Sequence, residues 1–195
     1  HVDKKVWISE VTDKHGAINR PKKCLECHDP HGSKQKHILT KTTTELCLGC
    51  HEDVMSELQL ASNHKPALED CSNCHQGHGM ADKKLLSQDT NSLCLSCHTD
   101  LETAASLANT HSPFVDGSCL DCHLPHGSKH ANLTISKRGT LCSECHDDVN
   151  DWLADASVHE PTKTDLCNKC HEPHASKHSM LLKDDRNELC LTCHS

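Results

Sequence analysis

The chain has 195 residues, a formal net charge of −8 and a mean hydropathy of −0.64, and only 2% of its residues are aromatic. A domain of this length normally buries many more large apolar side chains, so the composition excludes a conventional hydrophobic core. It also excludes a transmembrane helix, because no apolar run is long enough, and the acidic charge argues against a nucleic-acid partner. On composition alone, the chain would be close to disordered.

All 16 cysteines lie in eight copies of the motif Cys-x-x-Cys-His. This is the attachment signature of c-type haem, in which two thiols form thioether bonds and the histidine that follows ligates the iron. The cysteines are Cys24, Cys27, Cys47, Cys50, Cys71, Cys74, Cys94, Cys97, Cys119, Cys122, Cys142, Cys145, Cys167, Cys170, Cys190 and Cys193. The proximal histidines are His28, His51, His75, His98, His123, His146, His171 and His194. We therefore expect eight covalently attached c-type haems, which would supply the missing apolar mass and cross-link the chain.

Three other uses of Cys-x-x-Cys pairs fit the motif less well. A zinc ribbon does not require a histidine after each pair. A thioredoxin-like redox site has one such pair in a βαβ setting, which this sequence does not show. A disulfide framework would leave the histidines unexplained.

The motifs are arranged as four pairs. Within each pair the first cysteines are 23 residues apart, and successive pairs begin 47, 48 and 48 residues apart. A period of this size is typical of stacked repeats. We predict one multihaem domain over residues 1–195, made of four repeats with two c-type haems each. The predicted repeats are 1–52, 53–99, 100–147 and 148–195.

Each repeat is predicted to contain the same elements in the same order. It opens with an amphipathic helix of about three turns that ends in a histidine. The pattern is clearest before His159, where Val149, Leu153 and Ala156 share one face, and the segment VWISEVTDKH before His15 aligns with it. The first motif follows, then a turn marked by Pro or Gly, a polar loop such as LTKTTTE, and the second motif. The predicted fold is mostly irregular with short α-helices, no substantial sheet, and a haem-cored linear array of four two-haem repeats.

Two further histidines recur in each repeat, as many as two bis-histidine haems require. One ends the opening helix, and the other lies three residues after the first proximal histidine. We predict that these histidines are the distal ligands of eight six-coordinate, low-spin haems. They are His15, His31, His64, His78, His111, His126, His159 and His174.

The spacing restricts how the distal histidines are assigned. Three residues of extended chain span at most about 10 Å, whereas the Cα atoms of two histidines on one iron are roughly 12 Å apart. His31 therefore cannot oppose His28. We expect it to serve the second haem of its repeat, attached at Cys47 and Cys50, with His15 at the first haem. The other histidines do not recur at the same position in every repeat, and we expect them to lie beside the haems or in solvent. His1 is a further candidate ligand for a haem of a neighbouring molecule. They are His1, His37, His130 and His178.

These motifs resemble the multihaem cytochromes with a doubled Cys-x-x-Cys-His motif over essentially the whole chain. The resemblance is carried by CLECHDPH with LCLGCH, CSNCHQGH with LCLSCH, CLDCHLPH with LCSECH, and CNKCHEPH with LCLTCH. It implies little secondary structure, bis-histidine ligation and haems stacked in a continuous chain. Members include periplasmic carriers, conduits through outer-membrane porins and extracellular cytochrome filaments. Because this haem is attached outside the cytoplasm, and the chain starts at His1 like a processed protein, we expect an exported protein, extracellular or periplasmic.

The resulting functional prediction is long-range electron transfer through a chain of closely spaced haems, with no catalytic residues. Repeat proteins normally have terminal repeats of altered sequence that cap the array, and neither end of this array is altered in that way. This favours head-to-tail self-association into a filament, or cytochrome nanowire. A discrete periplasmic carrier or porin-conduit component is the alternative, because a haem can itself cap an end. A multihaem reductase with one open haem is a third possibility, which the ligand count and the lack of Cys-x-x-Cys-Lys disfavour. The expected partners are redox proteins or extracellular acceptors.

Overall fold

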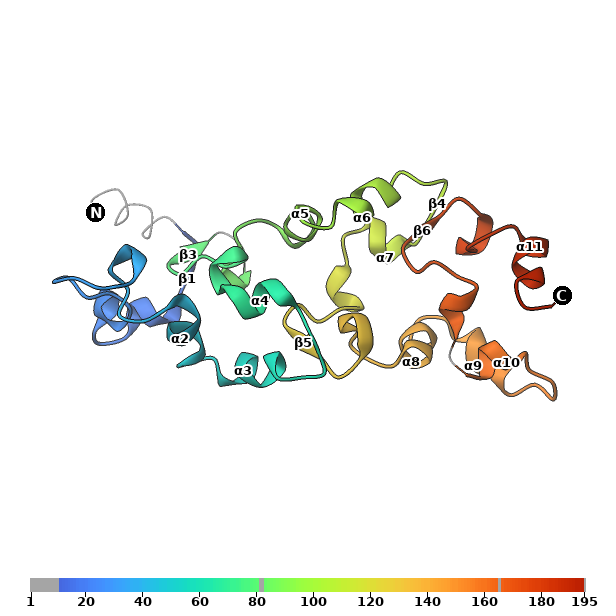
Figure 1. Ribbon diagram of the computed structural model, residues 1–195, viewed down its shortest axis with the longest axis horizontal. Coiled ribbons are helices and arrows are strands. Elements are labelled where there is room, and N and C mark those ends of the chain that lie inside the picture. Colours follow the sequence, from blue (N-terminus) through green and yellow to red (C-terminus); the bar gives the residue numbers. More distant parts are fainter. Residues whose placement is uncertain (1–10, 81–82, 165, 195) are drawn as a thin grey trace. The chain divides into compact units, whose positions relative to one another are not determined.

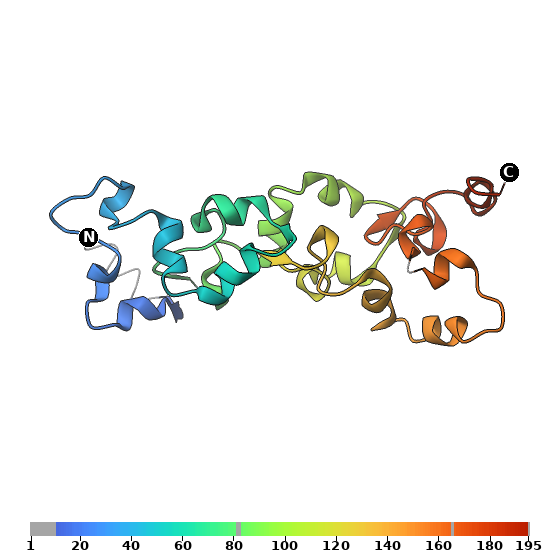
Figure 2. The ribbon, with the colours of Figure 1, turned by 60° about the horizontal axis from the view of Figure 1, so that its bottom comes forward.

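The computed structural model describes residues 11–80, 83–164 and 166–194. The chain divides into two compact units, each considered by itself. One unit contains the described residues up to Leu93 together with Pro125–Gly127, and the other contains Cys94–Leu124 with the described residues from Ser128 onward. Both consist of short helices joined by irregular segments (Figures 1 and 2).

All helices in the described part of the chain are short. The α-helices are α2 (Thr43–Leu48), α3 (Glu52–Leu58), α4 (Lys65–Glu69), α5 (Thr90–Leu95), α6 (Thr99–Ala104), α7 (Ser112–Val115), α8 (Arg138–Ser143), α9 (Asp148–Leu153), α10 (Glu160–Lys163) and α11 (Arg186–Leu191). The 3-10 helices are η1 (Gly16–Asn19), η2 (Lys23–Glu26), η3 (Lys36–Ile38), η4 (Cys71–Asn73), η5 (Lys83–Leu85), η6 (Cys119–Asp121), η7 (Ala131–Leu133), η8 (Cys167–Lys169) and η9 (Ser179–Leu181). Helices of this length are marginal on their own, so their stability must come from what surrounds them.

The polar stretches before the second motifs were expected to be loops, and this prediction is wrong. Helices α2, α5, α8 and α11 begin in them and run into the second motif. A capping box starts α2, in which the Thr42 hydroxyl accepts from the Glu45 backbone N–H and the Glu45 carboxylate accepts from the Thr42 N–H. The Asp89 carboxylate caps α5 by accepting from the Ser92 backbone N–H at 2.9 Å. Thr42 and Asp89, which lie in stretches that suggested loops, are therefore helix caps.

The predicted opening helices exist but are shorter than expected. Helices α3, α6 and α9 end six to seven residues before His64, His111 and His159. Each of these histidines is instead the N-cap of a second helix, α4, α7 or α10, with a proline in its first turn. Proline fits there because the first turn leaves its N–H groups without intrahelical partners. Residues 1–10, which include the start of the corresponding segment before His15, lie outside the described residues.

Two-residue strands are the largest sheet elements among the described residues. Strand β1 (Asp13–Lys14) pairs antiparallel with β3 (Gly79–Met80), and β4 (Asn109–Thr110) with β6 (Ala175–Ser176), as Figure 1 shows. The remaining strands are β2 (Ser62–Asn63) and β5 (Gly127–Ser128). The prediction of a mostly irregular fold with short helices and no substantial sheet is confirmed.

The polypeptide buries almost no apolar side chain of its own. Among the described residues, the buried hydrophobic side chains are Leu58 and Ala175, at 9% and 8% exposure. The chain exposes 13865 Å² of surface, whereas a globular protein of this mass exposes about 9,000 Å². The side chains that would form a core in other proteins are therefore available to pack against a bound group.

Candidate haem sites

Histidine rings from distant parts of the sequence face one another in pairs. Their centroids are 5.9–6.2 Å apart, and their planes are inclined by 14–35°. Each pair joins one proximal and one distal candidate. The pairs are His15–His51, His28–His78, His75–His126, His111–His146, His123–His174 and His159–His194.

This separation fits one iron between two imidazoles. A metal–imidazole bond of about 2 Å plus a ring half-width of about 1 Å, taken on both sides, places the centroids about 6 Å apart. Direct packing alone would not hold six pairs to within 0.3 Å of one another. The residues present therefore fit bis-histidine haem. We call the pair that contains the first proximal histidine of a repeat the first site, and the other the second site.

A backbone carbonyl orients each proximal ring of the first sites. The Nδ1 atom lies 2.9 Å from the carbonyl oxygen nine residues further along, in all four repeats. Because a carbonyl only accepts, Nδ1 carries the proton, and the unprotonated Nε2 is left for the metal. The four bonds join His28 to His37, His75 to Lys84, His123 to Asn132, and His171 to Met180.

The carbonyls that accept these bonds belong to a strained turn. His37, Lys84, Asn132 and Met180 have φ values of 57–65°, and the residue after each also has positive φ. Left-handed backbone costs a non-glycine residue roughly 1–2 kcal/mol. Two such residues in succession, repeated four times, indicate that the turn is kept for the bond it makes to the proximal histidine.

At the second sites, carbonyl groups of the next repeat orient the distal histidine rings. The Nδ1 atoms of His15, His64 and His111 donate to the carbonyl oxygens of Gly77, Pro125 and Pro173, at 2.9–3.1 Å. The backbone N–H groups of the same histidines donate to the carbonyls of His78, His126 and His174. The short strands β1, β3, β4 and β6 extend these contacts. Two distal histidines are thus held together wherever consecutive repeats meet.

The expected assignment of the distal histidines is wrong. His15 faces His51 of the second motif, not His28, and His28 faces His78 of the next repeat. The histidine three residues after a first motif therefore belongs to the first site of the preceding repeat. Spacing along the chain did not reveal this, because it gives no information about which repeats lie side by side.

Not every distal candidate lies in such a pair. The side chain of His31 is 95% exposed, and its Nδ1 lies 3.5 Å from the Asp29 carboxylate. Within the described part of the chain, no histidine ring faces His31 or His171. The ligand roles of the individual histidines and cysteines stay predictions.

The cysteines bring the attachment points of successive motifs together. Burial raises the pKa of the Cys47 thiol to about 12, with the neighbouring Cys71 as the next cause. Burial likewise raises the pKa of the Cys142 thiol to about 11. The second cause is again a cysteine of the next repeat, Cys167. Within repeats, burial raises the pKa of Cys27, and Cys50 acts in the same direction. Thiols of adjacent motifs therefore lie close together both within and between repeats.

Glu57 is a site residue that sequence reasoning missed. Its carboxylate accepts from Nδ1 of His126 at 2.9 Å. A carboxylate on the far side of a ligating imidazole increases the basicity of the ligand. The residues at the positions that correspond to Glu57 in the next two repeats are Ala104 and Trp152, so repetition in the sequence gave no signal. At the equivalent His174, burial lowers the pKa of the ring, and the neighbouring His123 lowers it further, which favours the neutral form that a metal ligand requires.

The histidines outside the repeated set make contacts mainly through their backbone, and Nδ1 of His178 lies 3.6 Å from the Asp185 carboxylate. The backbone carbonyl of His37 orients His28, and the backbone N–H groups of His130 and His178 donate to the hydroxyls of Ser128 and Ser176. His1 lies outside the described residues. The prediction that these residues lie beside the haems or in solvent remains open.

In the described ranges, no helix has both the length and the apolar character needed to cross a membrane. Comparison with curated proteins gives no match. The sequence does match the family described as doubled CXXCH motif, four times, at residues 15–56, 64–103, 111–151 and 159–195. The matched segments cover most of the chain, and each contains one pair of motifs. The protein therefore belongs to the doubled CXXCH motif family, and it is a multihaem c-type cytochrome involved in electron transfer.

Proposed function

We propose that the protein carries eight bis-histidine haems in one continuous series and conducts electrons over a long distance along them. It takes one electron at a time from a reduced redox protein and gives it to an oxidised redox protein or extracellular acceptor, with no transfer of atoms or protons. When bound, each haem iron alternates between the ferric and ferrous states and so accepts and donates one electron.

The proximity of cysteines from adjacent motifs is the observation that carries this proposal. Cys27 and Cys50 influence one another within a repeat, and Cys47 and Cys71 do so between repeats. In the later repeats, Cys122 and Cys145 are related in the same way, and so are Cys142 and Cys167. Closely spaced attachment points within each unit are what electron hopping from haem to haem requires.

The polypeptide acts by holding and tuning the ligands. Carbonyls in the strained turns fix the orientation of the proximal rings of the first sites, so these imidazoles would hold a bound haem in one orientation. Glu57 adds negative charge behind His126, which favours the ferric state at that site. We further propose an exported protein, periplasmic or extracellular, because haem attachment to this motif takes place outside the cytoplasm.

The experiment that tests the function uses protein purified with its haems from a host that exports it. We expect the intact mass to show eight haems and one molecule to take up eight electrons from a reductant. The reduced protein should then transfer all of them to an oxidised c-type cytochrome. A mass with fewer haems, or irons that are never reoxidised by the acceptor, would contradict the proposal.

One observation favours a second candidate function, a reductase with one open haem. No histidine ring faces His171 in the described part of the chain, so a haem attached at Cys167 and Cys170 would have His171 as its one histidine ligand from these residues. Catalytic turnover of nitrite or hydroxylamine by the reduced protein would support this function. The first site of the fourth repeat otherwise repeats the bonds of the other three, including the 2.9 Å bond from His171 to Met180.

A further inference from the structure

The places where consecutive repeats meet, which we call junctions, share one set of bonds. In each junction, the backbone N–H of one distal histidine donates to the carbonyl of a second distal histidine. The Nδ1 atom of the first histidine donates to the carbonyl of the residue just before the second. The second histidine then faces the first proximal histidine of the preceding repeat. The junctions bring together His15 with His78, His64 with His126, and His111 with His174.

The fourth repeat carries one half of a further junction. His159 is the counterpart of His111, and Ser157 and Val158 are the counterparts of strand β4. His159 faces His194, as His111 faces His146. Yet in the described part of the chain no carbonyl accepts from the N–H or Nδ1 of His159, and no ring faces His171.

The first repeat carries the complementary half. His31 is the counterpart of His126, whose side chain is 25% exposed compared with 95% for His31. An added Cβ at Gly127 would lie 2.0 Å from the Glu57 carbonyl oxygen, whereas at the equivalent Gly32 it would have nothing within 4 Å. The surface that the junction covers in later repeats is therefore open in the first.

The open segment already has the conformation that its counterparts adopt in a junction. The Ser33 hydroxyl donates to the carbonyl of Leu39 and accepts from the backbone N–H of Gln35 at 2.9 Å. Ser128 and Ser176 make the same two bonds. Those two serines are 1% and 5% exposed, while Ser33 is exposed. Little conformational entropy remains to be lost when the segment docks.

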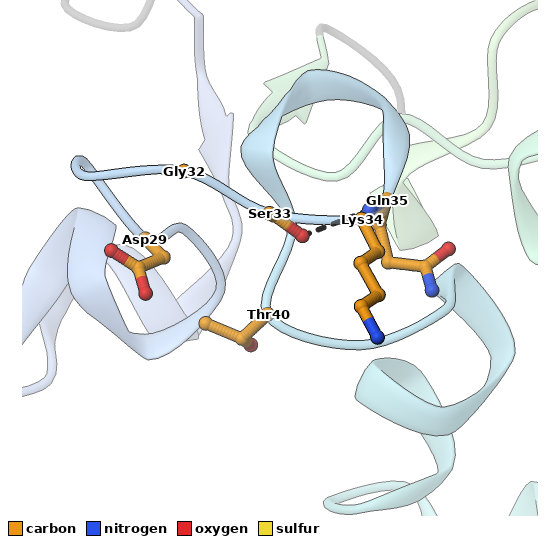
Figure 3. Close-up of a pocket in the computed structure, with 6 residues that line it drawn as sticks. All are labelled: Asp29, Gly32, Ser33, Lys34, Gln35 and Thr40. Atoms are coloured by element: carbon orange, nitrogen blue, oxygen red, sulfur yellow. Dashed lines mark hydrogen bonds between the residues drawn. The ribbon is translucent and has the colours of Figure 1, made fainter.

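A shallow pocket lies beside this segment. It has a volume of about 280 Å³ and is lined by Asp29, Gly32, Ser33, Lys34, Gln35 and Thr40. Figure 3 shows Asp29 on one side and Lys34 with Gln35 on the other, with the Ser33 backbone between them. The lining residues carry both charges and leave polar and apolar atoms exposed, which suits a short strand with one polar and one apolar residue, such as Ser157–Val158, as the covering segment.

We propose that the exposed His31 segment of one molecule docks onto the open end of the fourth repeat of a second copy, where His31 becomes the sixth ligand of the haem opposite His171. This inference rests on the proposed function. In the register of β4 and β6, Val158 would pair with Gly32 and Ser157 with Ser33. His159 would donate to the carbonyls of His31 and Pro30. One chain carries both halves, so the contact is head-to-tail and propagates instead of closing.

The test uses the haem-loaded chain and the variant His31→Ala, with His130→Ala as a matched control on a histidine whose ring faces no other among the described residues. Iron spin state is read by electron paramagnetic resonance and CO binding, and particle size by analytical ultracentrifugation and electron microscopy. We expect dilute wild-type protein to have one high-spin, CO-binding iron in eight, and this iron to become low-spin as the concentration rises and fibres form. His130→Ala should behave in the same way. His31→Ala should keep the high-spin iron and stay a single chain at every concentration.

A second pair of variants tests the partner surface without removing a ligand. Ser157→Pro removes the backbone N–H that would pair with Ser33, while Ser157→Ala keeps it. Neither His31→Ala nor Ser157→Pro should form fibres alone, but a mixture should form dimers, because each supplies the half that the other lacks. The His171 iron of the His31→Ala chain should then become low-spin, which halves the high-spin signal of the mixture.

Three outcomes would overturn the proposal. One is a wild-type single chain in which all eight irons are low-spin. Another is His31→Ala protein that assembles as the wild type does. The third is wild-type protein that stays a single chain with one CO-binding iron at every concentration, which excludes a second copy as the source of the ligand. Electron uptake by the haems would be retained in all three, so they are distinguishable from failure of the proposed function.

Discussion

The first and second sites of a repeat are built in opposite ways. At a first site the proximal ring is fixed within its own repeat, as His75 is by the Lys84 carbonyl, but the facing ring comes from the next repeat. At a second site both rings come from one repeat, as His15 and His51 do, and only the orienting carbonyl comes from the next. First sites therefore join repeats together, while second sites stabilise the interior of each repeat.

Removal of a distal ligand should show the difference between first and second sites most clearly. His126→Ala removes the ring that joins two repeats at a first site, whereas His159→Ala removes a ring within one repeat at a second site. Each variant should convert one iron to high spin. We expect His126→Ala to lower the free energy of unfolding by about 3 kcal/mol or more, and His159→Ala to lower it by less. Thermal unfolding followed by circular dichroism measures both, and equal losses would show that first sites do not join repeats.

The next largest effect is expected from crowding a junction without touching a ligand. An alanine Cβ at position 127 would lie 2.0 Å from the Glu57 carbonyl oxygen, so the backbone must move apart. Gly127→Ala should cost roughly 2–3 kcal/mol of stability. Gly77→Ala is the control, because nothing lies within 4 Å of its added Cβ, and it should change stability by less than about 0.5 kcal/mol. Urea unfolding of both variants gives the comparison, and similar midpoints would contradict a close approach at Gly127.

A smaller effect should distinguish one first site from the others. Glu57→Gln removes the negative charge behind His126. The reduction potential of that haem should rise by roughly 20–60 mV, about 0.5–1.4 kcal/mol for a one-electron couple. Glu52→Gln on the same helix should leave it unchanged. Spectroelectrochemical titration resolves the shift, and equal titration curves for the two variants would show that Glu57 does not tune the site.

The smallest effect is expected in a second-site helix. Thr42→Ala removes the capping box of α2 and should cost about 0.5–1 kcal/mol, while Thr43→Ala in the first turn should be nearly neutral. Hydrogen bonds from Thr42 lower the pKa of the Glu45 carboxyl, so their stabilisation is present above the ordinary pKa of glutamate and is lost as the pH falls through the lowered value. The difference between Thr42→Ala and wild type should therefore shrink at acid pH. A pH-independent difference in unfolding midpoints would exclude this cause.

The repeat structure shows how far the sequence alone leads. The spacing of the cysteines predicted the family and the kind of cofactor, because thioether attachment requires Cys-x-x-Cys-His at each haem. The scarcity of aromatic and large apolar residues predicted a fold with little core of its own. Helices α2 and α5 were missed, since Thr42 and Asp89 read equally well as loop residues until their hydrogen bonds are seen.

The sequence by itself determined which residues are available to hold haem, because covalent attachment and the turn after each motif are local chemistry. Only the tertiary structure decided which histidine faces which, since that depends on which repeats lie side by side. It placed His78 opposite His28 and left His31 exposed. It also brought Glu57 to His126 across 69 residues of sequence. Contacts over such separations are decided by packing between repeats, and a pattern read along one chain carries no record of them.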